Sequence, residues 1–250
     1  MEISIDGLKI NYSQEGKGDY VFILHGWDCD LTTYKMVVNI LKASYTVVAL
    51  DFPGFGQSEE PPTEWTMADY TDFTVRFVES FGCKKASFIG HSFGSRILIL
   101  MANKKNLTYA IDKMVFVAGA GILDANADFY IQEVRNFRKK RSQLIESKSY
   151  DELEQLRDSS DIEYAYKSDV MCKVYENAVA EDLEPFLPGI AVPTLLIWGE
   201  NDITTPVSDA KKMEKLISDS GLVVLQNAGH FPFLDQPYIF KRVMESFFEI

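Results

Sequence analysis

Six short apolar runs, rich in β-branched residues and almost free of polar alternation, recur along the chain. Strands that are buried on both faces have this composition, as in a parallel sheet covered by helices. The pattern therefore predicts six inner strands, at Tyr20–Leu24, Thr46–Leu50, Ala86–Ile89, Met114–Ala118, Thr194–Trp198 and Leu222–Leu225.

The start of the chain alternates instead between apolar and polar residues, first at Ile3 and Ile5 and then from Leu8 to Tyr12. Asp6-Gly7 separates the two runs, at the place where a type I′ turn needs positive φ. This pattern predicts an antiparallel hairpin.

Helical periodicity fills most of the segments between the inner strands. Asp30 and Thr32 are candidate N-caps for the first helix, and Thr66 with Asp69 forms an imperfect capping signal for the second. Strand and helix in regular alternation predict a doubly wound α/β sheet. The expected helices are Leu31–Ala43, Thr66–Phe81, Ser92–Ala102, Val207–Ser218 and Pro237–Phe248.

The alternation stops between the fourth and fifth inner strands, where the chain becomes helical and charged. We expect helices at Phe129–Ser147, Tyr150–Ser159 and Glu163–Ala180, closed by Pro185 and Pro188. The interpretation is a core domain of residues 1–121 and 190–250, with residues 122–189 inserted as a helical cap over the carboxyl edge of the sheet.

Composition excludes several classes of function. The net charge of −12 disfavours binding to nucleic acid and to an anionic membrane surface. The three cysteines are widely spaced, and neither a signal peptide nor a membrane-spanning run is visible. We therefore expect a cytoplasmic protein, monomeric or homodimeric, that acts on a small molecule.

The strongest local motif is Gly90-His91-Ser92-Phe93-Gly94, which follows a predicted strand and precedes a predicted helix. In this context G-x-S-x-G predicts a nucleophile elbow, in which Gly90 and Gly94 allow close backbone approach and Ser92 stands at a helix N-terminus. The Phe93 N–H then faces the developing oxyanion. The alternative is that Ser92 serves only as a helix N-cap.

A serine hydroxyl needs a base, and the chain has three histidines. His91 adjoins the serine and cannot reach its Oγ, and His25 ends a strand, so His230 in the last loop is the candidate base. The orienting carboxylate is Asp202, which follows a strand; Glu200 and Asp124 compete for this role. An Asx turn or a helix cap is the alternative role for Asp202.

The second oxyanion donor should come from the loop after the first inner strand. We assign it to the backbone N–H of Trp27, with Gly26 permitting the close approach and His25 ordering the loop.

Taken together, these motifs resemble those of the α/β-hydrolase superfamily over the whole chain. The resemblance implies a mostly parallel eight-stranded sheet flanked by helices, with the cap inserted after the sixth strand. It also implies that Asp51 and Ser58 are loop residues outside the triad. The motifs are His25-Gly26-Trp27, Asp51–Ser58, Gly90–Gly94, Trp198–Asp202 and Ala228–Phe231.

Within that superfamily the chain looks like small bacterial carboxylesterase-like hydrolases. We expect a serine hydrolase (EC 3.1.1) that cleaves a carboxylic ester or a related thioester or acyl bond, with no metal and no cofactor. One alternative is a C–C bond hydrolase or a lyase of the menaquinone-pathway type. Arginines near the site would support it, and the candidates are Arg96 and the basic run from Arg135 to Arg141. The other is a ligand-binding homologue without catalysis. Serine at position 92 disfavours the chemistry of haloalkane dehalogenases and epoxide hydrolases.

Four sequence features stay open. Ser95 replaces a glycine that is frequent after the elbow, and its small side chain should preserve packing. Asp28 and Asp30 follow the oxyanion loop, and either carboxylate would oppose an anionic substrate if it faced the pocket; the alternative is that Asp30 caps the next helix. The basic run from Arg135 to Arg141 either recognises an acidic substrate group or forms a solvated helix face. The cap aromatics pack on the sheet or line a pocket: Phe129, Tyr130, Phe137, Tyr164, Tyr166 and Tyr175.

Overall fold

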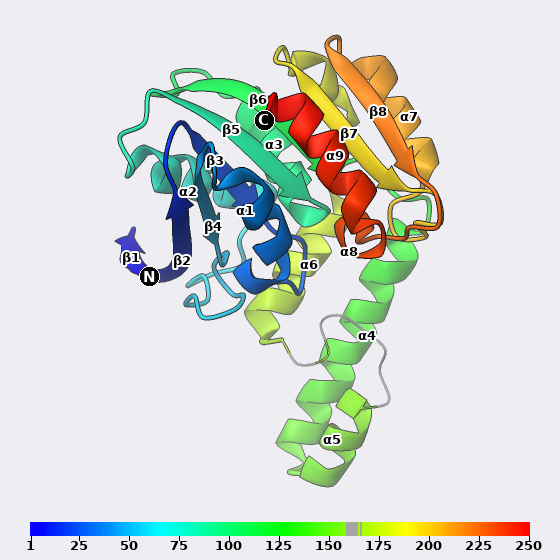
Figure 1. Cartoon of the computed structure of the whole chain (residues 1–250). Coiled ribbons are helices and arrows are strands. Elements are labelled where there is room, and N and C mark those ends of the chain that lie inside the picture. Colours follow the sequence, from blue (N-terminus) through cyan, green and yellow to red (C-terminus); the bar gives the residue numbers. More distant parts are fainter. Residues whose placement is uncertain (159–164, 166) are drawn as a thin grey trace.

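A computed structural model describes residues 1–158, 165 and 167–250 of the chain, and its centre is an eight-stranded sheet (Figure 1). The strand order is β1-β2-β4-β3-β5-β6-β7-β8. The strands are β1 (Glu2–Ile5), β2 (Leu8–Gly16), β3 (Tyr20–Leu24), β4 (Thr46–Leu50), β5 (Lys85–His91), β6 (Ala110–Val117), β7 (Thr194–Gly199) and β8 (Ser220–Leu225).

The first two strands run antiparallel, and β2 pairs antiparallel with β4. All pairs from β4 to β8 are parallel. Asp6 and Gly7 have φ of 52° and 84°, as the predicted hairpin turn requires. The mostly parallel eight-stranded sheet is thus confirmed, and the carboxyl ends of its inner strands meet along one edge.

Helices cover both faces of the sheet. Phe73 of α2 and Ile97 of α3 belong to the apolar cluster on one face, and Val37 of α1 and Phe240 of α9 belong to the cluster on the other. These two layers exclude water from the inner strands. The core helices are α1 (Lys35–Leu41), α2 (Met67–Glu79), α3 (Phe93–Ala102), α7 (Val207–Leu216), α8 (Pro232–Asp235) and α9 (Pro237–Phe248).

Local signals refine two predicted helices. The segment expected to form one helix from Leu31 begins as a 3-10 turn, η1 (Leu31–Tyr34), before α1 starts at Lys35. Asp30 caps this turn by accepting the N–H of Thr32. At α2 the capping box is complete, because Thr66 and Asp69 each accept the other's backbone N–H.

The inserted segment contributes α4 (Ala127–Glu146), α5 (Tyr150–Asp158), α6 (Asp169–Ala180) and the 3-10 helix η2 (Glu184–Gly189), all between β6 and β7. A hydrogen bond joins the start of this segment to the residue before η2, because the Leu183 N–H donates to the Gly121 carbonyl at 2.8 Å. Ser159 and the expected start of the third cap helix at Glu163 lie outside the described residues, as do Tyr164 and Tyr166.

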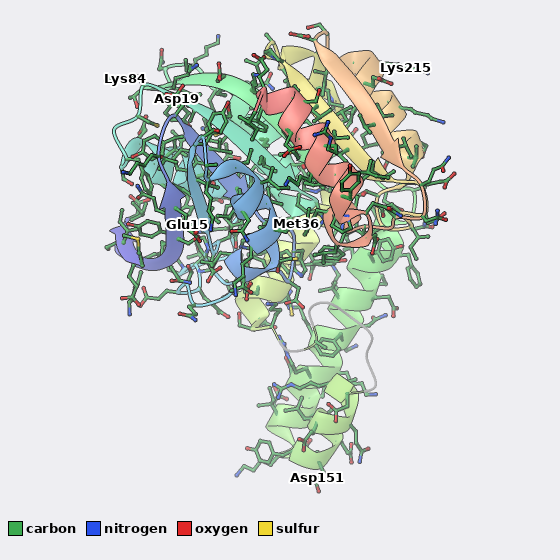
Figure 2. The ribbon with its side chains drawn as sticks, viewed as in Figure 1. Glu15, Asp19, Met36, Lys84, Asp151 and Lys215 are labelled. Carbon is green, nitrogen blue, oxygen red and sulfur yellow. The ribbon has the colours of Figure 1, made fainter. Side chains whose placement is uncertain are left out.

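The inserted segment, here named the cap, lies beneath the carboxyl edge of the sheet only in part. Figure 1 shows α6 and the start of α4 beneath the sheet, while the rest of α4 and α5 project away from it. Asp151 lies exposed at the tip of this projection (Figure 2). Among the described helices, none is both long and apolar enough to cross a membrane.

Candidate active site

The Ser92 turn joins β5 to α3 in a strained conformation, with φ 47° and ψ −112°. Its glycines are required by contact. A Cβ on Gly94 would lie 2.2 Å from the Leu24 carbonyl oxygen, and one on Gly90 would lie 2.9 Å from the Ser95 nitrogen. The Ser92 side chain makes no capping hydrogen bond to α3, which removes the interpretation of this serine as a simple N-cap.

Ser95 fits the position after the elbow. It is fully buried, and its Oγ donates to the Gly90 carbonyl at 2.8 Å. Its Oγ and Cβ leave room only for a glycine at position 119, where an added Cβ would lie 2.9 Å from that Oγ. The helix therefore keeps its close packing on the sheet, as the size of serine predicts.

His230 and Asp202 contact each other directly. Nδ1 of His230 and Oδ2 of Asp202 are 2.9 Å apart, and the aspartate side chain is fully buried. Of the two competing carboxylates, Glu200 is exposed, and Asp124 accepts the N–H of Asn126 in its own turn. Such a pair fixes the imidazole ring and stabilises its protonated form.

The second oxygen of Asp202 serves the turn that carries it. Oδ1 accepts the backbone N–H groups of Thr204 and Thr205 at 2.9 and 3.0 Å, so the Asx-turn role exists beside the contact with His230. Burial alone would raise the pKa of Asp202, but hydrogen bonds from His230 and Thr205 hold this pKa below its ordinary value. The carboxylate therefore stays ionised at neutral pH.

Ser92 and His230 are brought together through the intervening His91. Nε2 of His91 lies 2.8 Å from the His230 carbonyl oxygen, and the two imidazole centroids are 4.9 Å apart. Among the contacts of the described residues, no hydrogen bond joins Ser92 Oγ to the His230 ring. In unliganded enzymes such hydrogen bonds are often long and tighten only when substrate binds.

The loop of His25, Gly26 and Trp27 lies against the elbow, since a Cβ on Gly26 would be 3.3 Å from the Ser92 Cβ. Within the described part of the chain, the N–H groups of Trp27 and Phe93 donate to no other residue. Two N–H donors beside a serine are what an oxyanion hole needs.

His25 orders this loop. Its Nε2 accepts the Phe52 N–H at 2.8 Å, so Nδ1 carries the proton that goes to the Gly26 carbonyl at 2.7 Å. Burial lowers the pKa of His25 to about 4, and burial together with the nearby His230 lowers the pKa of His91 to about 3. Both rings are therefore neutral at physiological pH.

Asp51 and Ser58 are loop residues. The Asp51 carboxylate accepts N–H groups from Leu31 and Gln57, and Ser58 Oγ donates to the Asp51 carbonyl oxygen at 2.7 Å. Asp28 forms an ion pair with Lys167 at 2.7 Å. Neither Asp28 nor Asp30 lines the cavity beside Ser92.

A cavity of about 830 Å³ opens between the elbow and the cap. Ser92 and Thr205 line it, and Thr205 contacts both Asp202 and His230, which are not themselves part of the lining. Its other lining residues are Trp27, Phe93, Arg96, Ala120, Ile122, Asp124, Phe129, Tyr130, Glu133, Asn136, Phe137, Lys140, Leu156, Tyr175, Ala178, Val179, Ile203, Thr204 and Asp209.

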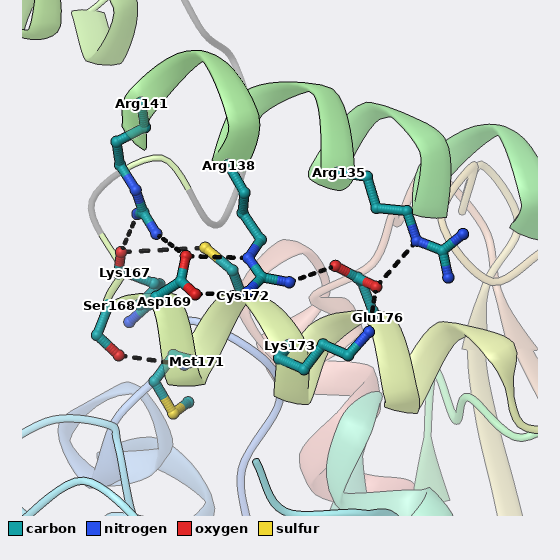
Figure 3. Close-up of polar contacts among 10 residues, drawn as sticks. All are labelled: Arg135, Arg138, Arg141, Lys167, Ser168, Asp169, Met171, Cys172, Lys173 and Glu176. Carbon is teal, nitrogen blue, oxygen red and sulfur yellow. Dashed lines mark hydrogen bonds and ion pairs between the residues drawn. The ribbon is translucent and has the colours of Figure 1, made fainter. Parts of the chain in front are cut away.

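The basic run of α4 pairs with α6 (Figure 3). Arg138 contacts Asp169 and Glu176, Arg141 contacts Asp169, and Arg135 contacts Glu176. Hydrogen bonds from Arg138 lower the pKa of Asp169 to about 2. These arginines therefore join the two cap helices, a role that neither sequence interpretation included.

Two contributors to the site, Thr205 and Tyr34, were not predicted from the sequence. Thr205 braces the pair of Asp202 and His230, and its spacing from Asp202 is the only local signal for it. Tyr34 lies beside His91, with its hydroxyl oxygen 2.8 Å from Nδ1, and carries no such signal. Arg96, which the sequence did single out, lines the cavity one turn along α3 from Ser92. No cluster of potential metal ligands occurs in the residues that the structure describes.

Comparison with known proteins gives the family. The sequence model of the alpha/beta hydrolase family matches residues 21–240, and the chain belongs to that family. It is 24% identical to the 2-hydroxy-6-oxo-6-(2'-aminophenyl)hexa-2,4-dienoic acid hydrolase of Metapseudomonas resinovorans, over 98% of this chain and 89% of that one. It is 22% identical to the pimeloyl-[acyl-carrier protein] methyl ester esterase of Legionella pneumophila, over 96% and 99%.

Solved structures have the same fold. An esterase from Exiguobacterium antarcticum superposes with a TM-score of 0.77 and 23% identity, over 98% of this chain and 97% of the other. The α/β-hydrolase fold is thereby confirmed, and the family supports hydrolase activity.

Proposed function

We propose that the protein hydrolyses a carboxylic ester, or a related thioester or acyl bond, of a small molecule. The observation that carries this proposal is the 2.9 Å contact between His230 Nδ1 and the buried Asp202. The neighbouring loop holds the strained Ser92, which lines a cavity. The named esterases among the relatives agree with this chemistry.

In the proposed reaction His230 removes the proton of Ser92 as its Oγ attacks the substrate carbonyl carbon. The N–H groups of Trp27 and Phe93 stabilise the negative oxygen of the tetrahedral intermediate. His230 then protonates the leaving alcohol, and a water molecule activated by the same ring hydrolyses the acyl-enzyme. Asp202 holds the ring in one tautomer throughout and stabilises the imidazolium form.

We assign substrate choice to the cap, residues 122–189. Phe129, Tyr130, Phe137 and Tyr175 line the cavity from α4 and α6, so the cap aromatics face the bound molecule. The walls are therefore largely apolar and aromatic, which is typical of small-molecule sites.

A panel of p-nitrophenyl esters from acetate to palmitate tests the proposal, together with labelling by a fluorophosphonate. We expect turnover of part of the panel and covalent labelling at Ser92. Ser92→Ala should reduce kcat by about 10⁴-fold or more and abolish the label, with an unchanged circular dichroism spectrum. Tight ligand binding with no turnover and no label in the wild type would instead identify a ligand-binding homologue.

One observation favours a second candidate, C–C bond hydrolysis of a substrate that carries a carboxylate. Arg96 is almost fully buried, lines the cavity and donates to the Glu181 carbonyl at 2.9 Å, with no ion pair to a carboxylate of the described residues. Buried charges are normally paired, so an anionic substrate group would complete this site. Turnover of a dienoic keto acid without turnover of simple esters would select this candidate.

A further inference from the structure

A chain of hydrogen bonds behind the elbow links three loops of the candidate site. The Gly26 N–H donates to the Tyr34 hydroxyl oxygen at 3.0 Å. The same oxygen lies 2.8 Å from His91 Nδ1, and His91 Nε2 lies 2.8 Å from the His230 carbonyl oxygen. The chain therefore runs from the oxyanion loop, through the elbow, to the loop of the candidate base.

The direction of each hydrogen bond follows from the groups involved. The carbonyl oxygen of His230 can only accept, so Nε2 of His91 carries a proton. In the neutral ring Nδ1 must then be an acceptor, and it takes the proton of the Tyr34 hydroxyl. That hydroxyl oxygen in turn accepts the Gly26 N–H. One tautomer of one neutral histidine satisfies all three contacts.

The surroundings hold this arrangement in place. Tyr34 and His91 are each about 1% exposed, and the His91 ring packs against Phe231 and Phe233. A Cβ on Gly26 would lie 2.6 Å from His91 Nδ1, so the loop approaches the ring as closely as a glycine permits. The lowered pKa of His91, about 3, keeps the ring in the neutral state that the chain of contacts needs.

We propose that Tyr34 and His91 are positioning residues that fix the main chain of His230 against the elbow and the oxyanion loop. This Tyr34–His91 strut rests on the proposed function, because its purpose is to set the spacing of Ser92, His230 and the Trp27 N–H. His230 is then held at two points, its carbonyl oxygen by His91 and its Nδ1 by Asp202. Rotation of the base away from the serine is thereby restricted, which is how supporting contacts preserve reactive geometry.

Tyr34→Phe tests the strut because it removes one hydroxyl and keeps the ring. With p-nitrophenyl esters we expect kcat to fall by about 10- to 100-fold and KM to change by less than about 3-fold. The rate of fluorophosphonate labelling at Ser92 should fall with kcat. The matched control is Tyr109→Phe, another buried tyrosine, whose hydroxyl contacts the sulfur of Met101 at 3.3 Å in the core. It should keep both rates.

Two substitutions of His91 separate positioning from packing. Glutamine can still donate a hydrogen bond from near the Nε2 position, whereas leucine fills the space without a donor. We expect His91→Gln to retain about 10-fold more kcat than His91→Leu. Equal rates for the two variants, or a Tyr34→Phe enzyme as fast as the wild type, would overturn the positioning role.

Nitrogen-15 NMR of the wild type separates failure of the strut from failure of the proposed function. The strut requires His91 to be a neutral ring protonated at Nε2, whether or not the protein turns over esters. A wild type with this tautomer but no labelling at Ser92 would contradict the serine hydrolase alone. A His91 protonated at Nδ1 in a protein that does label would contradict the strut alone.

Discussion

The sheet and the cap are held together by different forces. Every residue of β4 is buried, and two apolar clusters cover the two faces of the sheet. Where α4 meets α6, the buried apolar cluster of the described residues is Val134, Phe137, Ala165 and Cys172, and ion pairs add to the contact. Apolar packing fixes positions closely. Of the cap ion pairs, those of Asp169, which is 57% exposed, tolerate change at little cost, whereas those of Glu176, which is 2% exposed, do not. In the proposed reaction the reacting groups come from the core, and the residues that would select a substrate come largely from the cap.

The core side of this comparison is tested most strongly at Asp202. Asp202→Asn should lower kcat for esters by about 10³- to 10⁴-fold, because an amide holds the wrong tautomer of His230 and does not stabilise the imidazolium. Steady-state kinetics measures the effect. Glu200→Gln, two residues away on the exposed surface, is the control and should behave as the wild type. A similar loss in both variants would remove Asp202 from its proposed role.

Acidification should weaken the core before it breaks the cap pairs. His25 and His91 have pKa values of about 4 and about 3 in the folded protein, below the ordinary value of 6.5. Below pH 6.5 these histidines bind protons in the unfolded chain but not in the folded protein. The free energy of unfolding therefore falls as the pH drops toward 4. The slope should reach about 1.4 kcal/mol per pH unit for each ring.

The cap titrates in a lower range. The folded pKa of Asp169 is about 2, below the ordinary 3.8, so its contribution to stability is complete above pH 3.8 and is lost as the pH falls toward 2.

Thermal unfolding from pH 7 to 4 measures the effect of the two core histidines, and His91→Gln should reduce the slope by about half. A Tm independent of pH in this range would contradict the neutral buried histidines.

The smallest effect is expected inside the cap itself. Glu176 is 2% exposed and contacts Arg135, Arg138 and Lys173, so Glu176→Gln should cost about 1–3 kcal/mol. The lower part of that range reflects the exposure of Arg135. Hydrogen exchange should accelerate in α4 and α6 and stay unchanged in the sheet. Glu146→Gln, an exposed residue at the end of α4, is the control. Faster exchange throughout the sheet would mean that cap and core unfold together.

Much of the fold could be predicted from the sequence, because strands buried on both faces leave a continuous apolar run. The predicted bounds of β3 and β4 are identical to those found. The prediction for β6 began at Met114, four residues late, because Ala110 to Lys113 are partly exposed and not uniformly apolar. The 3-10 turn before α1 was missed for another reason, since helical periodicity alone does not distinguish it from a first α-helical turn.

The candidate site was predictable where one motif carries several groups, as at Ser92 and Phe93. The contacts that join distant segments were not. Tyr34 reaches His91 across 57 positions of sequence, and Arg138 reaches Glu176 across 38. Neither residue type reveals such a partner, because hydrogen bonds and ion pairs depend on where the folded chain brings a side chain.

The hydrogen bond from the Leu183 N–H to the Gly121 carbonyl has a consequence for the history of such a chain. The hydrogen bond holds the start of the inserted segment, after β6, next to its return toward β7. An insert of another length could begin and end at the same two strands, provided that it replaces the packing of Met171 and Val174 in the core cluster. Exchange of one segment could thus change the substrate, while the proposed reacting groups stay on the sheet.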